Sequence, residues 1–95
     1  MAAPMNIVYI HSHDTGTIIQ PYGYPVPAPR LSGLADESVM FENMFCANPT
    51  CSPSRAALLT GQYPHSCGQF GLSHRGFTMP SFDHHIVRYL ASHGY

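Results

Sequence analysis

The first clear hydrophobic stretch of the chain is a short apolar run close to its start. Within residues 6–11 it comprises Ile7, Val8, Tyr9 and Ile10. Such a run is typical of a strand that is buried on both faces of a parallel sheet. A polar cluster, His-Ser-His-Asp-Thr-Gly at 11–16, follows immediately. Because ligands of open α/β sheets bind at the carboxyl ends of strands, this cluster is the first candidate site.

The next segment contains one helical and one strand-like pattern after a proline-rich connection. Residues 20–29 contain four prolines and predict an irregular or extended connection. Residues 30–38 space their apolar side chains at helical intervals, with Pro29 suited to the first turn. In residues 39–45 apolar side chains alternate, which predicts a second strand, although Asn43 weakens the pattern.

Another helix and a long loop are predicted further along the chain. Ser52 or Ser54 can cap a helix that runs through residues 56–59 and ends at Gly61. Residues 62–80 are rich in Gly, Pro, Ser and His and predict a long loop. Loops of that length in compact domains usually have a function.

A last helix completes the order of predicted elements. Ser81 can cap it, Gly94 can end it, and its apolar side chains recur every three or four residues. The order strand, helix, strand, helix, loop, helix predicts an α/β class with a parallel or mixed sheet. Two strands are few for a sheet, so we expect residues 1–95 to be part of a larger domain.

Composition excludes several classes of partner. Charged residues make up only 9% of the chain, the formal net charge is -1, and the four basic residues are scattered arginines. Nucleic acid and membrane surfaces are therefore not expected as partners. No apolar run is long enough to span a bilayer, and no secretory signal is visible. Three cysteines do not suggest a disulfide framework, so a reducing, cytoplasmic location is the simplest expectation.

The most informative stretch is residues 51–61, Cys-Ser-Pro-Ser-Arg-Ala-Ala-Leu-Leu-Thr-Gly. It matches the signature of the sulfatase family, in which a cysteine, a proline, a serine and an arginine precede a short helix ending in Thr-Gly. The resemblance extends to residues 6–16, 29–45 and 61–65, in the order that the family has. The chain therefore resembles the N-terminal segment of a sulfatase.

The resemblance implies a fold and a modified nucleophile. The fold is the alkaline-phosphatase-like three-layer α/β fold with a mainly parallel sheet, of which this chain would be a truncated part. In sulfatases a formylglycine-generating or sulfatase-maturating enzyme oxidises the cysteine that corresponds to Cys51 to formylglycine. The hydrated aldehyde attacks sulfur while a divalent cation, usually Ca2+, holds one of its oxygens.

The resemblance also implies metal ligands in the polar cluster. Sulfatases place two adjacent aspartates after the first strand, and Asp14 matches one of them. His13 stands at the other position. Imidazole suits zinc or manganese better than calcium. His13 can therefore bind the metal, contact the sulfate as a cation, or support Asp14.

The spacing of Cys51 and Arg55 has a chemical reason. A sulfate ester spreads negative charge over its oxygens, so its site must supply positive charge and a strong nucleophile. Arg55 follows Cys51 by four residues, which places it one helical turn further on the same face. The start of the helix adds amide donors and a positive dipole end. We therefore predict that Arg55 orients the modified residue 51, and that this pair is catalytic.

Structural roles compete with each functional one. Cys51 can be an unmodified buried thiol, and Arg55 a solvated or carboxylate-bound arginine. Ser52 and Ser54 are expected to serve as caps or in recognition by the maturation enzyme.

The other chemically active side chains carry weaker predictions. His11 is expected to be a hydrogen-bonded core residue, and Cys46 and Cys67 are expected to be buried thiols. Three side chains can either reach an anionic substrate or have only a structural role: His65, His74 and Arg75. The histidines of the last predicted helix are expected to face water: His84, His85 and His93.

Three functions stay open. The first is hydrolysis of sulfuric ester or sulfamate bonds in a sulfated small molecule or sugar. Residues 71–72 and 81–83 resemble the heparan N-sulfatase branch, which favours a sulfated amino sugar. The second is a phosphonate or phosphate monoester hydrolase of the same superfamily. The third is a non-catalytic segment, because the family's later Lys, His, Asp and Asn site residues do not occur within residues 1–95. We expect these residues alone to be inactive.

Overall fold

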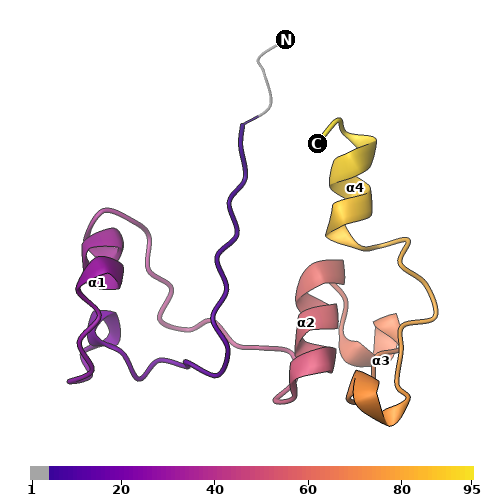
Figure 1. The fold of residues 1–95 in the computed structure, drawn as a ribbon, viewed down its shortest axis with the longest axis horizontal. Helices are drawn as coiled ribbons and strands as arrows, with labels where there is room; N and C mark the ends of the chain where they lie inside the picture. Colours follow the sequence, from indigo (N-terminus) through magenta and orange to yellow (C-terminus); the bar gives the residue numbers. More distant parts are fainter. Residues whose placement is uncertain (1–4) are drawn as a thin grey trace. The chain divides into compact units, whose positions relative to one another are not determined.

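The computed structural model describes residues 5–95, which form helices joined by turns and extended segments (Figure 1). The chain divides into two compact units, Met1–Asn43 and Met44–Tyr95. The helical elements are η1 (Gln20–Tyr22), α1 (Pro29–Asp36), α2 (Cys51–Thr60), α3 (Pro64–Cys67), η2 (Ser73–Arg75) and α4 (Ile86–Ser92). None of the helices in residues 5–95 has the length and apolar character that a bilayer crossing requires.

The two predicted strands are wrong for this part of the molecule. Residues 6–11 and 39–45 form neither helix nor strand, and no strand occurs anywhere in residues 5–95. Their apolar side chains are exposed, with Ile10 at 86% and Phe45 at 85%. A strand needs a neighbour whose N–H and C=O groups complete its hydrogen-bond ladder, and the described residues supply no such neighbour. The predicted α/β class is therefore not realised within this segment.

The first unit contains a tight turn that leads into α1. The Gln20 N–H donates to the carbonyl of Val26, and the Gln20 side-chain oxygen accepts from the Ala28 N–H, both at 2.9 Å. Gly23 ends η1 in the left-handed conformation, at φ 84. The predicted irregular connection over residues 20–29 thus contains one short 3-10 turn.

α1 confirms the helix predicted for residues 30–38. Pro29 occupies its first turn, where a missing N–H removes no helical hydrogen bond. The helix ends at Asp36, two residues before the predicted end. Leu31 and Leu34 remain 49% and 60% exposed, so the apolar side of α1 is only partly covered.

The second unit is built around α2, which packs against α3 and α4 (Figure 1). Pro53 is fully buried, and Ala56 and Ala57 are buried beside it. Pro53 lies in the first turn, where proline is tolerated. Gly61 ends the helix at φ 67 and donates its N–H to the carbonyl of Ala57 at 2.9 Å, which confirms the predicted stop.

The predicted serine caps of α2 are wrong. The helix begins at Cys51, so Ser52 and Ser54 lie inside it and Thr50 takes the cap position. The Thr50 side chain does not bond to the helix. Its hydroxyl and its N–H both donate to the side-chain oxygen of Asn48, at 2.6 and 2.9 Å, and this turn fixes the chain just before the helix.

The segment 62–80 is more ordered than the predicted loop, because α3 and η2 interrupt it. Gly68 ends α3 at φ 80, in the left-handed conformation. A Cβ atom at this position would lie 2.6 Å from Cδ of Pro80, so the chain comes too close here for any side chain.

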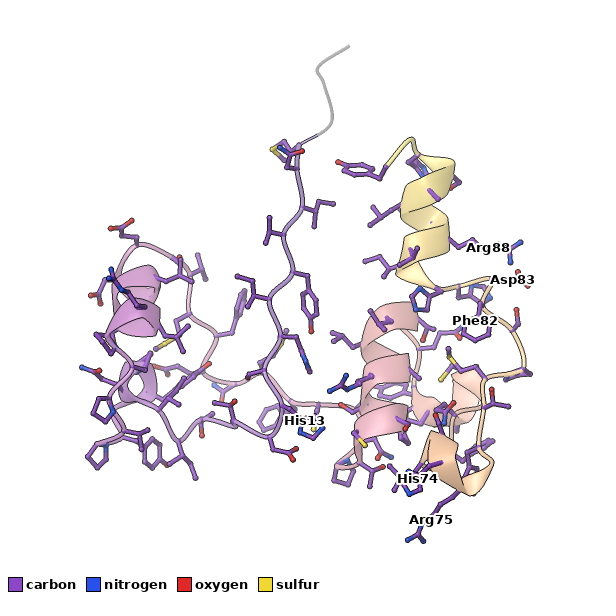
Figure 2. All side chains as sticks on the ribbon, in the orientation of Figure 1. His13, His74, Arg75, Phe82, Asp83 and Arg88 are labelled. Carbon is purple, nitrogen blue, oxygen red and sulfur yellow. The ribbon has the colours of Figure 1, made fainter. Side chains whose placement is uncertain are left out.

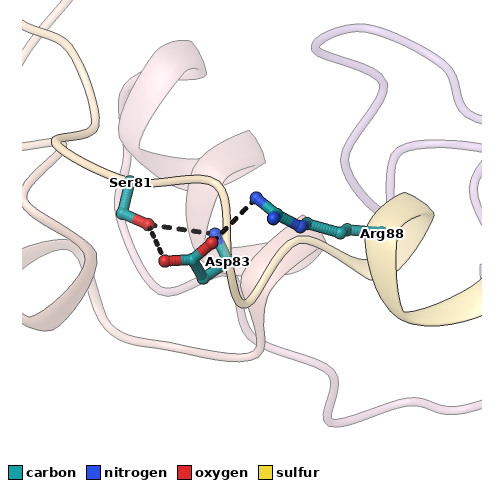
Figure 3. A network of polar contacts seen from close by, with 3 residues as sticks. All are labelled: Ser81, Asp83 and Arg88. Carbon is teal, nitrogen blue, oxygen red and sulfur yellow. Dashed lines mark hydrogen bonds and ion pairs between the residues drawn. The ribbon is translucent and has the colours of Figure 1, made fainter. Parts of the chain in front are cut away.

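The last helix begins later than predicted. α4 starts at Ile86, and His85 caps it by accepting the N–H of Val87 at Nδ1, at 3.2 Å. Ser81 instead forms a turn with Asp83 (Figure 3). The Ser81 hydroxyl donates to Asp83 Oδ2 at 2.7 Å and accepts the Asp83 N–H at 3.1 Å. Arg88 of α4 bonds the other carboxylate oxygen at 2.8 Å, which ties this turn to the helix.

Two glycine substitutions separate backbone strain from steric clash. Gly61→Ala places a Cβ in open space at positive φ, so we expect a loss of about 1–2 kcal/mol of unfolding free energy. Gly68→Ala adds the clash with Pro80 to the same strain and should lose about 1–3 kcal/mol more. Urea unfolding of both variants measures the difference. Equal losses would contradict the close packing of Gly68 on Pro80.

Candidate active site

One exposed face of α2 carries the two residues of the predicted catalytic pair. Pro53, Ala56 and Ala57 are buried, and on a helical projection they occupy one side of α2. Cys51 and Arg55 fall on the opposite side and are exposed. The buried side of the helix therefore turns the pair towards solvent. The helical spacing predicted for the pair is present, since α2 begins at Cys51.

Arg55 has no acidic partner in the described part of the chain. The two ion pairs among residues 5–95 join His13 to Asp14 and Arg88 to Asp83. The alternative of a carboxylate-bound Arg55 thus finds no support within these residues. An exposed guanidinium one turn after Cys51 is available to an anion that approaches the start of the helix.

The three cysteines differ in exposure, and none forms a disulfide. Cys51 is exposed, which contradicts the alternative of a buried thiol. Cys67 is buried and its thiol lies 3.7 Å from the carbonyl of Pro64, as expected of a structural cysteine. Cys46 is exposed, so the prediction of a buried thiol was wrong there. Cys51 differs from Cys46 in its place at the start of a helix.

The polar cluster of the first unit brings His13 and Asp14 together. His13 Nδ1 lies 2.9 Å from Asp14 Oδ2, and both side chains are largely exposed. Figure 2 labels His13. In the described residues neither Nε2 of His13 nor Oδ1 of Asp14 has a hydrogen-bond or ion-pair partner. Asp14 has φ 55, and aspartate is one of the few non-glycine residues that tolerate this left-handed conformation.

The donor atoms fit a hard divalent cation only in part. The Asp14 carboxylate is an oxygen ligand of the kind that calcium prefers, whereas the imidazole of His13 is not. Within residues 5–95 no three side chains of the types His, Cys, Asp and Glu converge to hold a metal. Asp14 and His13 can thus contribute to a metal site, and further ligands must come from elsewhere.

Other histidines make ring contacts. His11 is exposed and stacks on Tyr9 at 5.8 Å between ring centroids, so it is not the core residue that we expected. His65 is exposed and stacks on Tyr63 at 5.6 Å. The second contact favours the structural alternative for His65.

A folded loop, residues 69–77, lies against the start of α2. The Ser73 N–H donates to the side-chain oxygen of Ser52 at 3.1 Å. Gln69, only 4% exposed, holds the loop from inside: its Nε2 donates to the carbonyls of Gly71 and Phe77 at 2.6 and 3.1 Å. Sequence reasoning missed both contacts. A single glutamine in a glycine-rich segment gives no signal of burial, and Ser52 resembled a cap.

Two side chains are presented by this loop. His74 and Arg75 belong to η2, which closes with hydrogen bonds from Arg75 N–H to Leu72 O at 2.9 Å and from Gly76 N–H to Ser73 O at 3.0 Å. Both are exposed, and Figure 2 shows them on the side of the second unit where the first turn of α2 lies.

Comparison with known proteins gives one family. Residues 5–95 match the sulfatase family. An ulvan-active sulfatase of Formosa agariphila is 40% identical over 74 residues, which are 77% of this chain and 12% of that protein. Human N-sulphoglucosamine sulphohydrolase is 37% identical over 83 residues, 86% of this chain and 16% of that protein. Human N-acetylgalactosamine-6-sulfatase is 46% identical over 63 residues, which are 64% of this chain and 12% of that protein.

No solved structure matches the chain. The chain spans about an eighth to a sixth of the length of these curated relatives. The family match nevertheless covers nearly all of the chain, including the 51–61 segment and the polar cluster. Cys51 and Arg55, exposed on α2, lie within the matched residues. These matches show that the chain belongs to the sulfatase family.

Proposed function

We propose that residues 1–95 form the N-terminal part of a sulfatase catalytic domain that hydrolyses sulfuric ester or sulfamate bonds. The observation that carries the proposal is the exposed Cys51–Arg55 pair at the start of α2, inside the family's signature. The sulfatase family implies an alkaline-phosphatase-like fold. In our proposal the exposed apolar segments 6–11 and 39–45 become strands of its mainly parallel, three-layer sheet.

The proposed nucleophile is a formylglycine made from Cys51 by a formylglycine-generating or sulfatase-maturating enzyme. The exposure of Cys51 supports this, because a modifying enzyme must reach the thiol. One hydroxyl of the hydrated aldehyde loses its proton and its oxygen forms a bond to sulfur, and the S–O bond (S–N in a sulfamate) to the leaving group breaks as that group gains a proton. The second hydroxyl then loses its proton, the carbonyl reforms, and the C–O bond that joins residue 51 to the sulfate breaks, so that sulfate leaves.

Asp14, His13 and the modified residue 51 are the proposed ligands of a divalent cation, taken to be Ca2+. Such a cation supplies positive charge against the sulfate and lowers the pKa of the nucleophile. The contact between His13 Nδ1 and Asp14 Oδ2 supports a positioning role for His13, in which it orients the carboxylate. Its free Nε2 keeps open the two other roles, as a metal ligand or as a contact to the sulfate.

The proposed role of Arg55 is to hold the modified residue 51 and the negative charge that develops beside it. Its exposure and lack of an acidic partner in the described residues support this role. The first turn of α2 adds its amide groups and the positive end of the helix dipole on the same side as residue 51.

The proposed substrate is a sulfated sugar. The names of the relatives specify ulvan, N-sulphoglucosamine and the 6-sulfate of N-acetylgalactosamine, all of which are carbohydrates. The alternative within the superfamily is a phosphonate or phosphate monoester hydrolase, which places the same charge demands on its site.

Parallel assays with an aryl sulfate and an aryl phosphonate test the reaction class. We expect the complete protein that carries these residues to hydrolyse the sulfate faster. We expect residues 1–95 alone to hydrolyse neither compound, since the chain contains no lysine and only part of a metal site. Faster phosphonate turnover by the complete protein would favour the alternative, and sulfatase activity of the isolated segment would contradict the proposed division of the site.

Replacement of Arg55 by alanine tests the catalytic pair. We expect kcat of the complete, modified protein to fall about a hundredfold or more, as when one donor to a developing anion is removed. Arg30→Ala, which removes an exposed arginine of α1, should leave kcat unchanged. Turnover of Arg55→Ala equal to that of the unmutated protein would end the assignment.

Asp14→Asn tests the metal ligand without disturbing the backbone. Asparagine tolerates the left-handed conformation as aspartate does, so the loop should keep its shape. The calcium concentration for half-maximal activity should rise by at least about tenfold, since even loss of a ligand's hydrogen-bond partner costs that much. An unchanged calcium dependence would show that Asp14 does not bind the ion.

A further inference from the structure

The second unit carries an unbalanced positive charge. Asp83 is the only acidic side chain in residues 44–95. It forms an ion pair with Arg88, in which Oδ1 of Asp83 lies 2.8 Å from a guanidinium nitrogen (Figure 3). The two other arginines of the unit, Arg55 and Arg75, therefore have no carboxylate partner within it. Arg55 already has a proposed role beside the modified residue 51, whereas Arg75 has none.

Arg75 is held near Cys51 by the hydrogen bond between Ser73 and Ser52. Ser52 is the immediate neighbour of Cys51, and its hydroxyl oxygen lies 3.1 Å from the Ser73 nitrogen. The path from Ser73 N to Ser52 Oγ, along the Ser52 side chain and back one residue places the Ser73 backbone within about 10 Å of the Cys51 backbone. Arg75 follows Ser73 by two residues, so its long side chain extends from backbone that is held near the start of α2, and Figure 2 shows that it points outward into solvent there.

The loop that presents Arg75 is fixed from inside. Gln69 is buried and bridges the carbonyls of Gly71 and Phe77, on either side of η2. A Cβ at Gly71 would lie 2.6 Å from the ring of Phe77, so the two arms of the loop are in direct contact. Pairing of this kind limits the movement of η2. The backbone that carries Arg75 is therefore held in place, and its unpaired guanidinium is available to bind an anion.

We propose that Arg75, with His74 beside it, binds a second anionic group of the substrate, next to the sulfate that is removed. This inference rests on the proposed sulfatase function. The group is a carboxylate or a further sulfate on the neighbouring sugar, because both present oxygen pairs that a guanidinium binds in the same way. Ser52 is a positioning residue for this subsite, and Arg75 determines specificity.

The test compares three matched disaccharides with the complete, modified protein. All carry the same scissile sulfate, and the neighbouring sugar is neutral, carries a carboxylate, or carries a second sulfate. In Arg75→Gln we expect the ratio of kcat/KM for an anionic substrate to that for the neutral one to fall about tenfold or more, as a charged hydrogen bond is lost. The carboxylate and disulfated substrates show separately which anion the subsite prefers. Arg75→Lys keeps the charge but lacks the paired N–H donors, so it should restore only part of the ratio.

Two further variants distinguish a local effect of Arg75 at the subsite from an effect of the net charge of the unit. Arg88→Gln removes an exposed arginine of the same unit that already has a partner, and it should leave the ratio unchanged. Ser52→Ala removes the acceptor of the Ser73 N–H. It should lower the ratio in the same direction as Arg75→Gln and speed hydrogen exchange at the Ser73 amide, with the mass of residue 51 confirming equal modification.

Failure of this inference is distinguishable from failure of the proposed function. An unmutated protein that hydrolyses none of the three sulfates would overturn the function itself. A protein that hydrolyses all three, with the ratio unchanged in Arg75→Gln, would overturn the subsite alone. An equal fall in Arg88→Gln would also overturn it, because the effect would then come from net charge.

Discussion

The burial of one side of α2 is the constraint on which the site depends. Pro53, Ala56 and Ala57 are packed inside the second unit, so the helix cannot rotate without exposing them. That fixed rotation turns Cys51 and Arg55 outward, one helical turn apart. Gly61 ends the helix and α3 folds back against it. The small size of the buried side chains lets these elements approach closely.

Local signals in the sequence predicted α1, α2 and α4, but not the short elements η1, α3 and η2. A proline at the start, helical spacing and a terminal glycine each act within a few residues, so α1 and the end of α2 were expected nearly where they lie. Capping was predicted poorly. Ser52 bonds to the distant Ser73 and Ser81 to Asp83, and a hydroxyl can satisfy itself in several such ways.

The prediction of two strands was wrong for a different physical reason. The apolar patterns of residues 6–11 and 39–45 report only that these segments suit a buried sheet. Whether a sheet forms depends on partner strands, and the described residues provide none. Their exposed apolar side chains agree with a place in the larger alkaline-phosphatase-like fold that the sulfatase family implies.

The candidate site could be predicted only for residues that lie in recognisable sequence motifs. Cys51 and Arg55 were predicted from residue types at fixed spacing, and Asp14 from the resemblance to sulfatases. Their roles stay predictions, to which the structure adds their exposure and the contact of Asp14 with His13. Gln69 and the loop at His74 and Arg75 were not predictable in this way, since their arrangement depends on contacts across many residues.

The most direct test is a crystal structure of the complete protein, produced with its maturation enzyme and grown with calcium. The account predicts that residue 51 has lost its sulfur and that one of its oxygens and an oxygen of Asp14 lie within about 2.3–2.6 Å of one ion. An intact thiol at residue 51, or an Asp14 too distant to share that ion, would contradict it.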